Sequence, residues 1–206
     1  MRILAVSAGL LALSLPAQAA PTLEGVATGL YELEKTHAFL TWTVKHNGIS
    51  GYTVNFTDFD ADLAFDAETP ANSQLSVTIN PLMMNTNYPD AEKKVDWETE
   101  LATDARFMNA GEFPTITFAS TSVDQTGDAE GTVTGDLTFL GVTKPVTLDV
   151  TYGGVANPPW FGQRDVIGFT ASTTITRSDF GSTSLGGVIS DDVTIEFSGE
   201  FLQAEE

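Results

Sequence analysis

The feature that most constrains this chain is the alternation of apolar and polar residues along most of its length. In the stretch 39–46, for example, Leu40, Trp42 and Val44 alternate with two threonines and a lysine. Successive side chains of a β-strand point to opposite faces, so a period of two is typical of strands that cover a core with one face. The same pattern marks eight predicted strands, at 39–46, 52–65, 75–79, 116–120, 133–139, 146–152, 167–175 and 193–201.

The second of these segments changes its parity midway. Val54 and Phe56 occupy even positions, whereas Phe59 and Leu63 occupy odd ones. A shift of one residue turns every later side chain to the opposite face of the sheet, so an inserted residue has to absorb the change. The sequence therefore predicts a β-bulge or a corner at Thr57-Asp58.

One short helix is expected between the third and fourth strands. Pro89-Asp90 is a suitable start, and the stretch 91–105 carries apolar residues at a loosely helical spacing. The other connections are mostly short. Eight amphipathic strands with such connections favour an all-β fold, an extended antiparallel barrel, because closure removes the exposed edges of an open sheet. A two-sheet sandwich is the alternative.

Residues 1–19 have the features of an export signal. Arg2 precedes a short apolar run, and Ala17-Gln18-Ala19 places small residues where a signal peptidase reads them. The run is shorter than the roughly 20 residues that a membrane-spanning helix needs. We therefore expect cleavage after Ala19, a single domain over residues 20–206, and a location in the periplasm or the medium.

The charge and the cysteine count narrow the function further. The formal net charge is −19 at pH 7, which repels nucleic acid and anionic lipid surfaces, so no nucleic-acid partner is expected. Because the chain has no cysteine, its stability has to come from the core. Alternation alone also fits an outer-membrane barrel. The charged ending Glu205-Glu206 argues against that, and we expect a barrel that is not embedded in a membrane. The oligomeric state stays open, a homodimer included.

Aromatic residues on the predicted inward faces indicate either a filled core or a ligand cavity. An eight-stranded barrel is just filled by its own side chains or is wide enough for one ligand. Small residues on the same faces, among them Gly135, Ala171 and Gly199, leave space beside the large ones. We expect an elongated apolar cavity, and the candidate ligand contacts are Trp42, Phe56, Phe65, Phe118, Phe139, Phe169 and Phe197.

Several short motifs resemble the YceI-like family of polyisoprenoid-binding proteins. They are Val44-Lys45-His46-Asn47-Gly48, the run Leu140-Gly141-Val142-Thr143-Lys144-Pro145-Val146 and Arg177-Ser178-Asp179-Phe180-Gly181. The resemblance extends from about residue 31 to about residue 202. It implies a lipocalin-like barrel, usually exported, whose tunnel accommodates an isoprenoid or a similar amphiphile. It brings no catalytic residues.

Two polar residues are further candidate ligand contacts. His46 follows the inward parity of Trp42 and Val44, so it would lie at a cavity end and bond a ligand head group, or else be satisfied by the backbone. Arg177 would contact a phosphate or quinone oxygen, or else fix a loop. Neither His37 nor His46 has the spacing to other ligands that a zinc site shows, so we expect no metal and no cofactor.

The sequence thus predicts an exported lipid-binding protein rather than an enzyme. Its ligand would be a polyisoprenoid, an isoprenoid quinone or a similar long amphiphile, held for transport, storage or stress protection. The alternative is a small periplasmic enzyme that acts on a lipid-like substrate, with His46 and a nearby carboxylate as its acid–base pair. The chain contains no motif of the nucleophile-elbow type.

Overall fold

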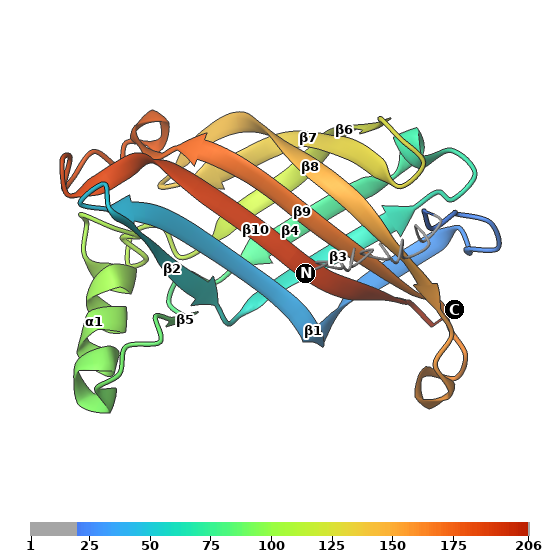
Figure 1. The fold of residues 1–206 in the computed structure, drawn as a ribbon, viewed down its shortest axis with the longest axis horizontal. Coiled ribbons are helices and arrows are strands. Elements are labelled where there is room, and N and C mark those ends of the chain that lie inside the picture. The colour runs from blue at the N-terminus through green and yellow to red at the C-terminus, as the bar shows by residue number, and fades with distance from the viewer. Residues whose placement is uncertain (1–19, 206) are drawn as a thin grey trace, which may run out of the picture.

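The computed structural model describes residues 20–205, most of which form one antiparallel sheet that closes into a barrel (Figure 1). The predicted signal sequence, residues 1–19, lies outside the described residues. In the described part of the chain eight strands form the closed ring, so the predicted barrel is confirmed and the sandwich is excluded. In ring order they are β1 (Gly29–His46), β10 (Ile189–Gln203), β9 (Val166–Thr176), β8 (Val142–Ala156), β7 (Glu130–Phe139), β6 (Ile116–Gln125), β4 (Gln74–Ile79) and β3 (Phe59–Phe65).

Strand β1 is long enough to pair with two different strands along the same edge. Its first residues, 29–32, pair with β3 and close the ring. Residues 40–46 pair instead with β2 (Ser50–Phe56), which in turn pairs with the short β5 (Met84–Asn85). Strands β2 and β5 therefore leave the ring and lie beside one end of the barrel (Figure 1).

The predicted corner at Thr57-Asp58 is confirmed. These two residues form a bend that separates β2 from β3. Val54 and Phe56 before the bend and Phe59 and Leu63 after it are all buried, so the bend absorbs the change of parity. The second predicted segment is therefore two strands.

A bulge in β1 changes the inward parity once more. Glu34 pairs with Glu200 of β10, while Ala38 pairs with the adjacent Gly199, so the three residues between Glu34 and Ala38 have no partner on β10. An odd number of extra residues turns the strand over. The buried positions of β1 are accordingly odd before the bulge and even after it.

A two-residue turn joins β7 to β8. Leu140 and Gly141 have φ angles of 48° and 72°, as a type I′ hairpin turn requires, and this favours glycine. A Cβ on Gly141 would also lie 2.6 Å from the ring of Phe113. The connection is confined to these two residues, because residues 142–145 already pair with β7.

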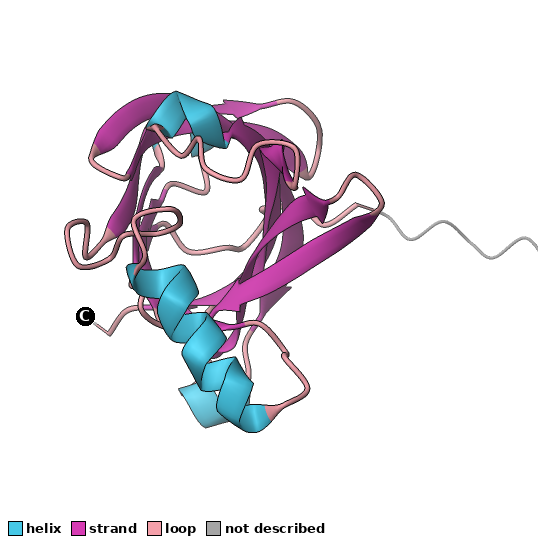
Figure 2. Ribbon diagram, turned by 90° about the vertical axis from the view of Figure 1, so that its left-hand side faces the viewer, coloured by secondary structure: helices cyan, strands magenta, loops and turns pink. Residues whose placement is uncertain are grey.

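The predicted helix is α1 (Ala91–Thr103), which ends two residues earlier than expected. The side chain of Asp90 caps it by accepting hydrogen bonds from two backbone N–H groups of the first turn. Trp97 donates from Nε1 to the hydroxyl of Tyr52 in β2 over 2.7 Å. This contact holds α1 beside one end of the barrel, the end that faces the viewer in Figure 2.

Three short 3₁₀ helices lie in the connections of the described chain: η1 (Pro70–Asn72), η2 (Pro159–Phe161) and η3 (Arg177–Phe180). Over residues 20–205, no helix combines the length and the apolar character that a membrane span requires.

Two inward glycines are covered by phenyl rings. A Cβ built on Gly135 in β7 would lie 2.4 Å from the ring of Phe118, and one on Gly199 in β10 would lie 2.6 Å from the ring of Phe197. The expectation that these glycines leave room for a ligand is therefore wrong, because neighbouring rings fill that space. Ala171 differs, since it lines the cavity described below.

Tyr31 anchors the interior far from α1 through a buried polar network. It is 1% exposed, and its hydroxyl donates to the carbonyl oxygen of Ala27 over 2.7 Å and lies 3.3 Å from Oδ2 of Asp165. Asp165 also accepts from the backbone N–H of Ala27 and from the side chain of Asn157. Burial, reinforced by the Asp165 carboxylate, raises the pKa of Tyr31 well above its usual value.

We predict that this network makes the fold sensitive to alkali. A tyrosine in the unfolded chain ionises near pH 10, whereas Tyr31 keeps its proton in the fold, so its contribution is complete below about pH 10 and is lost as the pH rises further. Tyr31→Phe should cost about 1–2 kcal/mol at pH 7 because its hydrogen bonds are lost. It should also flatten the decline in stability above about pH 10.

Urea unfolding from neutral to alkaline pH measures both effects, with Tyr88→Phe as the control because Tyr88 is 40% exposed. An alkaline decline of the same steepness in Tyr31→Phe and in the unmodified protein would contradict the prediction.

We also predict that Gly135→Ala destabilises the barrel by roughly 1–3 kcal/mol, the usual cost of overpacking. The new methyl group would lie 2.5 Å from the carbonyl oxygen of Ala119 and against the ring of Phe118. Gly29→Ala in β1 is the control, because a Cβ there has no heavy atom within 4 Å. Chemical denaturation compares the two variants, and equal stabilities would refute this account of Gly135.

Candidate functional site

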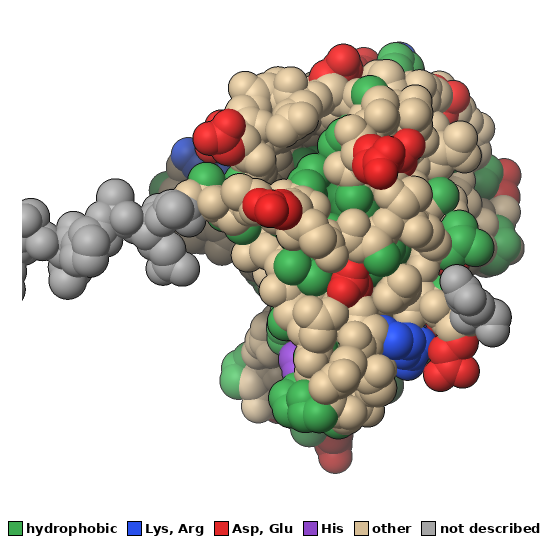
Figure 3. All heavy atoms as spheres, turned by 90° about the vertical axis from the view of Figure 1, so that its right-hand side faces the viewer, with side chains coloured by type: hydrophobic (Ala, Val, Ile, Leu, Met, Phe, Trp, Pro, Cys, Tyr) green, Lys and Arg blue, Asp and Glu red, His purple; other side chains and the backbone are tan. Residues whose placement is uncertain are grey.

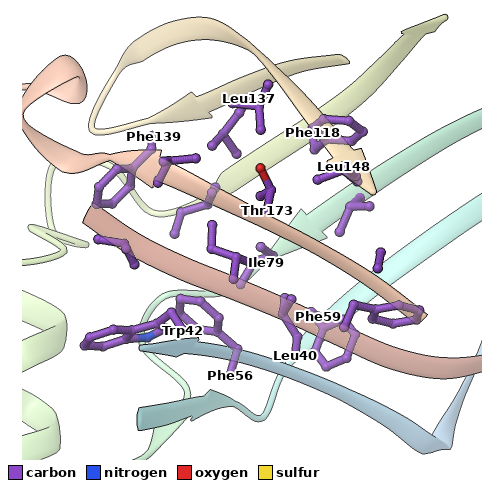
Figure 4. Close-up of a pocket in the computed structure, with 18 of the residues that line it drawn as sticks. Leu40, Trp42, Phe56, Phe59, Ile79, Phe118, Leu137, Phe139, Leu148 and Thr173 are labelled. Atoms are coloured by element: carbon purple, nitrogen blue, oxygen red, sulfur yellow. The ribbon is translucent and has the colours of Figure 1, made fainter. Parts of the chain in front are cut away.

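The barrel interior holds a cavity of about 210 Å³, called the main cavity here. Each strand of the ring contributes side chains to its wall, and Figure 4 shows them pointing inward from different strands. Along β10 the lining begins at Ile189 and continues from Val193 to Phe201, and this second stretch alone spans about 26 Å at roughly 3.3 Å per residue. The wall is therefore elongated, and nearly all of it is apolar.

Most of the predicted ligand contacts lie on this wall. Their inward orientation follows from the alternation within each strand, whereas their contact with a ligand stays a prediction. The predicted residues that line the main cavity are Trp42, Phe56, Phe118, Phe139, Arg177 and Phe197.

Two predicted contacts, Phe65 and Phe169, lie elsewhere. They line a second cavity of about 110 Å³, together with Tyr152 and residues of the connection from β6 to β7. The two cavities share no lining residue among those described. The second cavity lies at the end of the barrel remote from α1, and Figure 3 shows acidic side chains around hydrophobic ones on that face.

A row of five aromatic rings, from β3, β9 and β10, runs from the lining of the main cavity to that of the second cavity. Phe59 contacts Phe197, Phe197 contacts Phe201, Phe201 contacts Phe169, and Phe169 contacts Phe65, with ring centroids 6.1–6.5 Å apart. The rings meet edge-on or tilted, which are the geometries that aromatic pairs prefer. We call these five residues the aromatic septum. Its first three members line the main cavity, and its last two line the second cavity.

Arg177 places a buried cation on the wall of the main cavity. It is 6% exposed; its Nε donates to the carbonyl oxygen of Ser190 over 2.9 Å, and its Nη1 donates to that of Ser182 over 2.6 Å. Among residues 20–205, its Nη2 has no hydrogen-bond partner. The nearest carboxylate, that of Asp191, is 4.0 Å from Nε and half exposed. Arg177 therefore fixes the connection between β9 and β10 and keeps one donor free.

Each cavity also has an unpaired polar atom in a buried lining residue. In the described part of the chain, Nε1 of Trp42 and the hydroxyl of Tyr152 are buried without a hydrogen-bond partner. Leaving a buried donor unpaired costs about 1–3 kcal/mol. Trp42 lies on the α1 side of the main cavity (Figure 4), so an oxygen atom of a bound ligand is a candidate acceptor there.

The prediction that His46 lies at a cavity end is wrong. Its side chain is exposed and lines neither cavity. The pairing of β1 with β10 shifts between Val44 and His46, so the inward parity ends at Val44. The ring of His46 contacts the side chain of Asn47 instead, over 3.2 Å.

Sequence reasoning missed the part of the main cavity that α1 supplies. Leu101 of α1 and the following Phe107 and Met108 all line it. The helical spacing of the apolar residues in 91–105 indicated that Leu101 is buried. No local pattern shows that α1 lies at the barrel end, because that placement depends on the bond between Trp97 and Tyr52.

The structure brings three potential metal ligands together at the bulge of β1. One ligand atom each of Glu34, His37 and Glu200 lies within 4.8 Å of the other two. Carboxylate and imidazole groups are ligands of Zn²⁺ and related ions. Spacing along the sequence gave no sign of this cluster, because strand pairing brings Glu200 beside Glu34. The cluster lines neither cavity.

Comparison with known proteins agrees with this architecture. A family model of the YceI-like domain matches residues 31–201. A UPF0312 protein of Yersinia enterocolitica is 38% identical over 178 residues, which cover 85% of this chain and 87% of that relative. The crystal structure of a Campylobacter jejuni YceI protein matches with a TM-score of 0.66 at 32% identity, covering 78% of this chain and 90% of that one.

A more distant structure shares the fold alone. It is a polyisoprenoid-binding domain from Saccharophagus degradans, implicated in plant cell wall breakdown, with a TM-score of 0.60 at 16% identity. The match covers 85% of this chain and 98% of that domain. With the family model spanning most of its length, the chain belongs to the YceI-like family.

Proposed function

We propose that this protein is an exported binding protein that holds one polyisoprenoid, isoprenoid quinone or similar long amphiphile in the main cavity. The observation that carries the proposal is the elongated apolar wall to which each strand of the ring contributes. Polar groups are confined to a few positions on this wall. Such a space suits a hydrocarbon tail with a single small head group.

The energetics of burial favour a long ligand. Each methylene-sized group removed from water contributes about 0.8 kcal/mol, so ten such groups contribute about 8 kcal/mol. Estimates of the cost of association range from about 4 to more than 15 kcal/mol, which a tail of about twenty such groups offsets. A long chain therefore binds through its tail alone, and polar contacts serve mainly to orient it.

Arg177 and Trp42 are the groups that would receive the head group. Both line the main cavity and both have an unused donor, Nη2 in Arg177 and Nε1 in Trp42. The overall charge of −19 disfavours an anionic head group. A neutral oxygen acceptor, such as a quinone carbonyl, meets both donors without that penalty.

The comparisons support binding as the activity. The Saccharophagus degradans neighbour is described as polyisoprenoid-binding, and this chain belongs to the YceI-like family. The enzyme alternative relied on His46, which is exposed and lines neither cavity. Export and a periplasmic or extracellular location are proposed from residues 1–19, and the role is transport, storage or stress protection of the ligand.

We predict that organic extraction of the purified protein releases a prenyl lipid, and that the emptied protein binds menaquinone-4. Val146→Phe, which adds a ring to the cavity wall, should weaken this binding at least tenfold. Thr147→Phe adds the same ring on the exposed face of β8 and is the matched control. Quenching of tryptophan fluorescence measures the affinity. An empty protein that binds neither quinones nor prenyl lipids would end the proposal.

We also predict that Arg177→Gln weakens binding of menaquinone-4 roughly tenfold more than binding of phytane, a hydrocarbon of similar length. A hydrogen bond to a charged group contributes about 1.5–3 kcal/mol, and only the quinone can accept one. Lys144→Gln is the control, because it removes a cation that lines neither cavity. Competition assays give both affinities. Equal losses for the two ligands would assign Arg177 a purely structural role.

A further inference from the structure

We infer that the aromatic septum sets the length of the hydrocarbon chain that the main cavity accepts. The tail of the ligand ends against Phe59, Phe197 and Phe201, and the second cavity is closed to it. This inference rests on the proposed function, since it concerns the same cavity and the same class of ligand.

The direction of the ligand follows from where the polar groups lie. Trp42 lies on the α1 side of the main cavity, and Phe59 of the septum lies on the opposite side (Figure 4). Arg177 follows β9 at the same end as Trp42, because Thr176 pairs with Asp192 and Trp42 pairs with Ile195. A head group bound at the α1 side directs its tail toward the septum. The wall between these two ends offers the tail apolar contacts from every strand of the ring.

We expect the septum to block the tail because its neighbouring rings, on β3, β9 and β10, pack against one another. The centroid distances of 6.1–6.5 Å are those of packed aromatic pairs. Protein interiors are close-packed, so a chain cannot pass without displacing a ring. Such a partition predicts that the two cavities have different lining residues, and among residues 20–205 they share none.

Phe169 is the ring on which the partition depends most. Its centroid lies 6.1 Å from that of Phe65, 5.5 Å from that of Tyr152 and 6.1 Å from that of Phe201. Removing this ring therefore joins the two cavities. Ala171 is the next inward position along β9 and lies on the main-cavity side of Phe169. A larger residue at position 171 therefore shortens the part of the main cavity that a ligand tail can occupy before it reaches the septum.

The septum predicts a characteristic dependence of affinity on chain length. Each added isoprene unit strengthens binding while it gains apolar contacts. Once the tail reaches the septum, further units have to stay outside the cavity and add little. Affinity then stops rising, and the length at which it stops reports the position of the barrier.

The experiment measures the affinity of the emptied full-length mature protein for geraniol, farnesol, geranylgeraniol and solanesol. In the unmodified protein, solanesol should bind within about twofold of geranylgeraniol. Phe169→Ala should bind solanesol at least tenfold more tightly than geranylgeraniol, because its longer tail enters the second cavity. Ala171→Leu should make affinity level off at a shorter chain than in the unmodified protein.

Two controls keep the chemistry of the substitutions but leave the septum intact. Phe39→Ala removes a ring that is 64% exposed on the outer face of β1. Thr170→Leu enlarges an exposed residue next to Ala171. Both should retain the chain-length dependence of the unmodified protein. If Phe169→Ala does not fold, Phe169→Leu and Ala171→Leu still shift the dependence in opposite directions.

The possible results separate this inference from the proposed function. The septum is not a length limit if the affinity of the unmodified protein keeps rising up to solanesol. It is not one either if all variants show the same dependence of affinity on chain length. Both results leave lipid binding intact. Failure to bind both menaquinone-4 and an alcohol of any length overturns the proposed function itself.

Discussion

The pairing of β1 with β10 is the interaction on which the rest of the structure depends. It joins the first and last strands of the ring, so each ring strand has neighbours on both edges. Closure also creates the interior, because inward side chains from strands distant in the sequence meet only when the ring is complete. The cavities and the septum are therefore products of one long-range contact, and the bulge in β1 allows that contact to persist along a strand whose inward parity changes.

The sequence predicted the fold well because period-two alternation is a direct record of which side chains face a core. The interruption at Thr57-Asp58 could be predicted for the same reason, since a change of parity requires either a β-bulge or a corner. The first part of β1 was missed because the unpaired residues 35–37 interrupt the alternation. No local sequence pattern indicates that β2 leaves the ring and pairs with β5, because this depends on which strand each half of β1 pairs with.

The candidate site could be predicted only in part, and the reason is again geometrical. Parity placed Phe118 and Phe139 on the cavity wall, but it failed for His46, where the register shifts. Parity does not say how far a residue lies along the barrel axis. For that reason the sequence grouped Phe169 with Phe139 as lining one tunnel, whereas the structure assigns them to different cavities.

Under the proposed function, the unpaired indole N–H of Trp42 would link ligand binding to the stability of the fold. A ligand that binds only the folded state stabilises it in proportion to the logarithm of its concentration relative to the dissociation constant. If the proposed function is right, a barrel that has released its ligand would lose this contribution and would again bury an unsatisfied donor. Under that proposal, the empty form would be the less stable one, and proteases would degrade it in preference to the ligand-bound form.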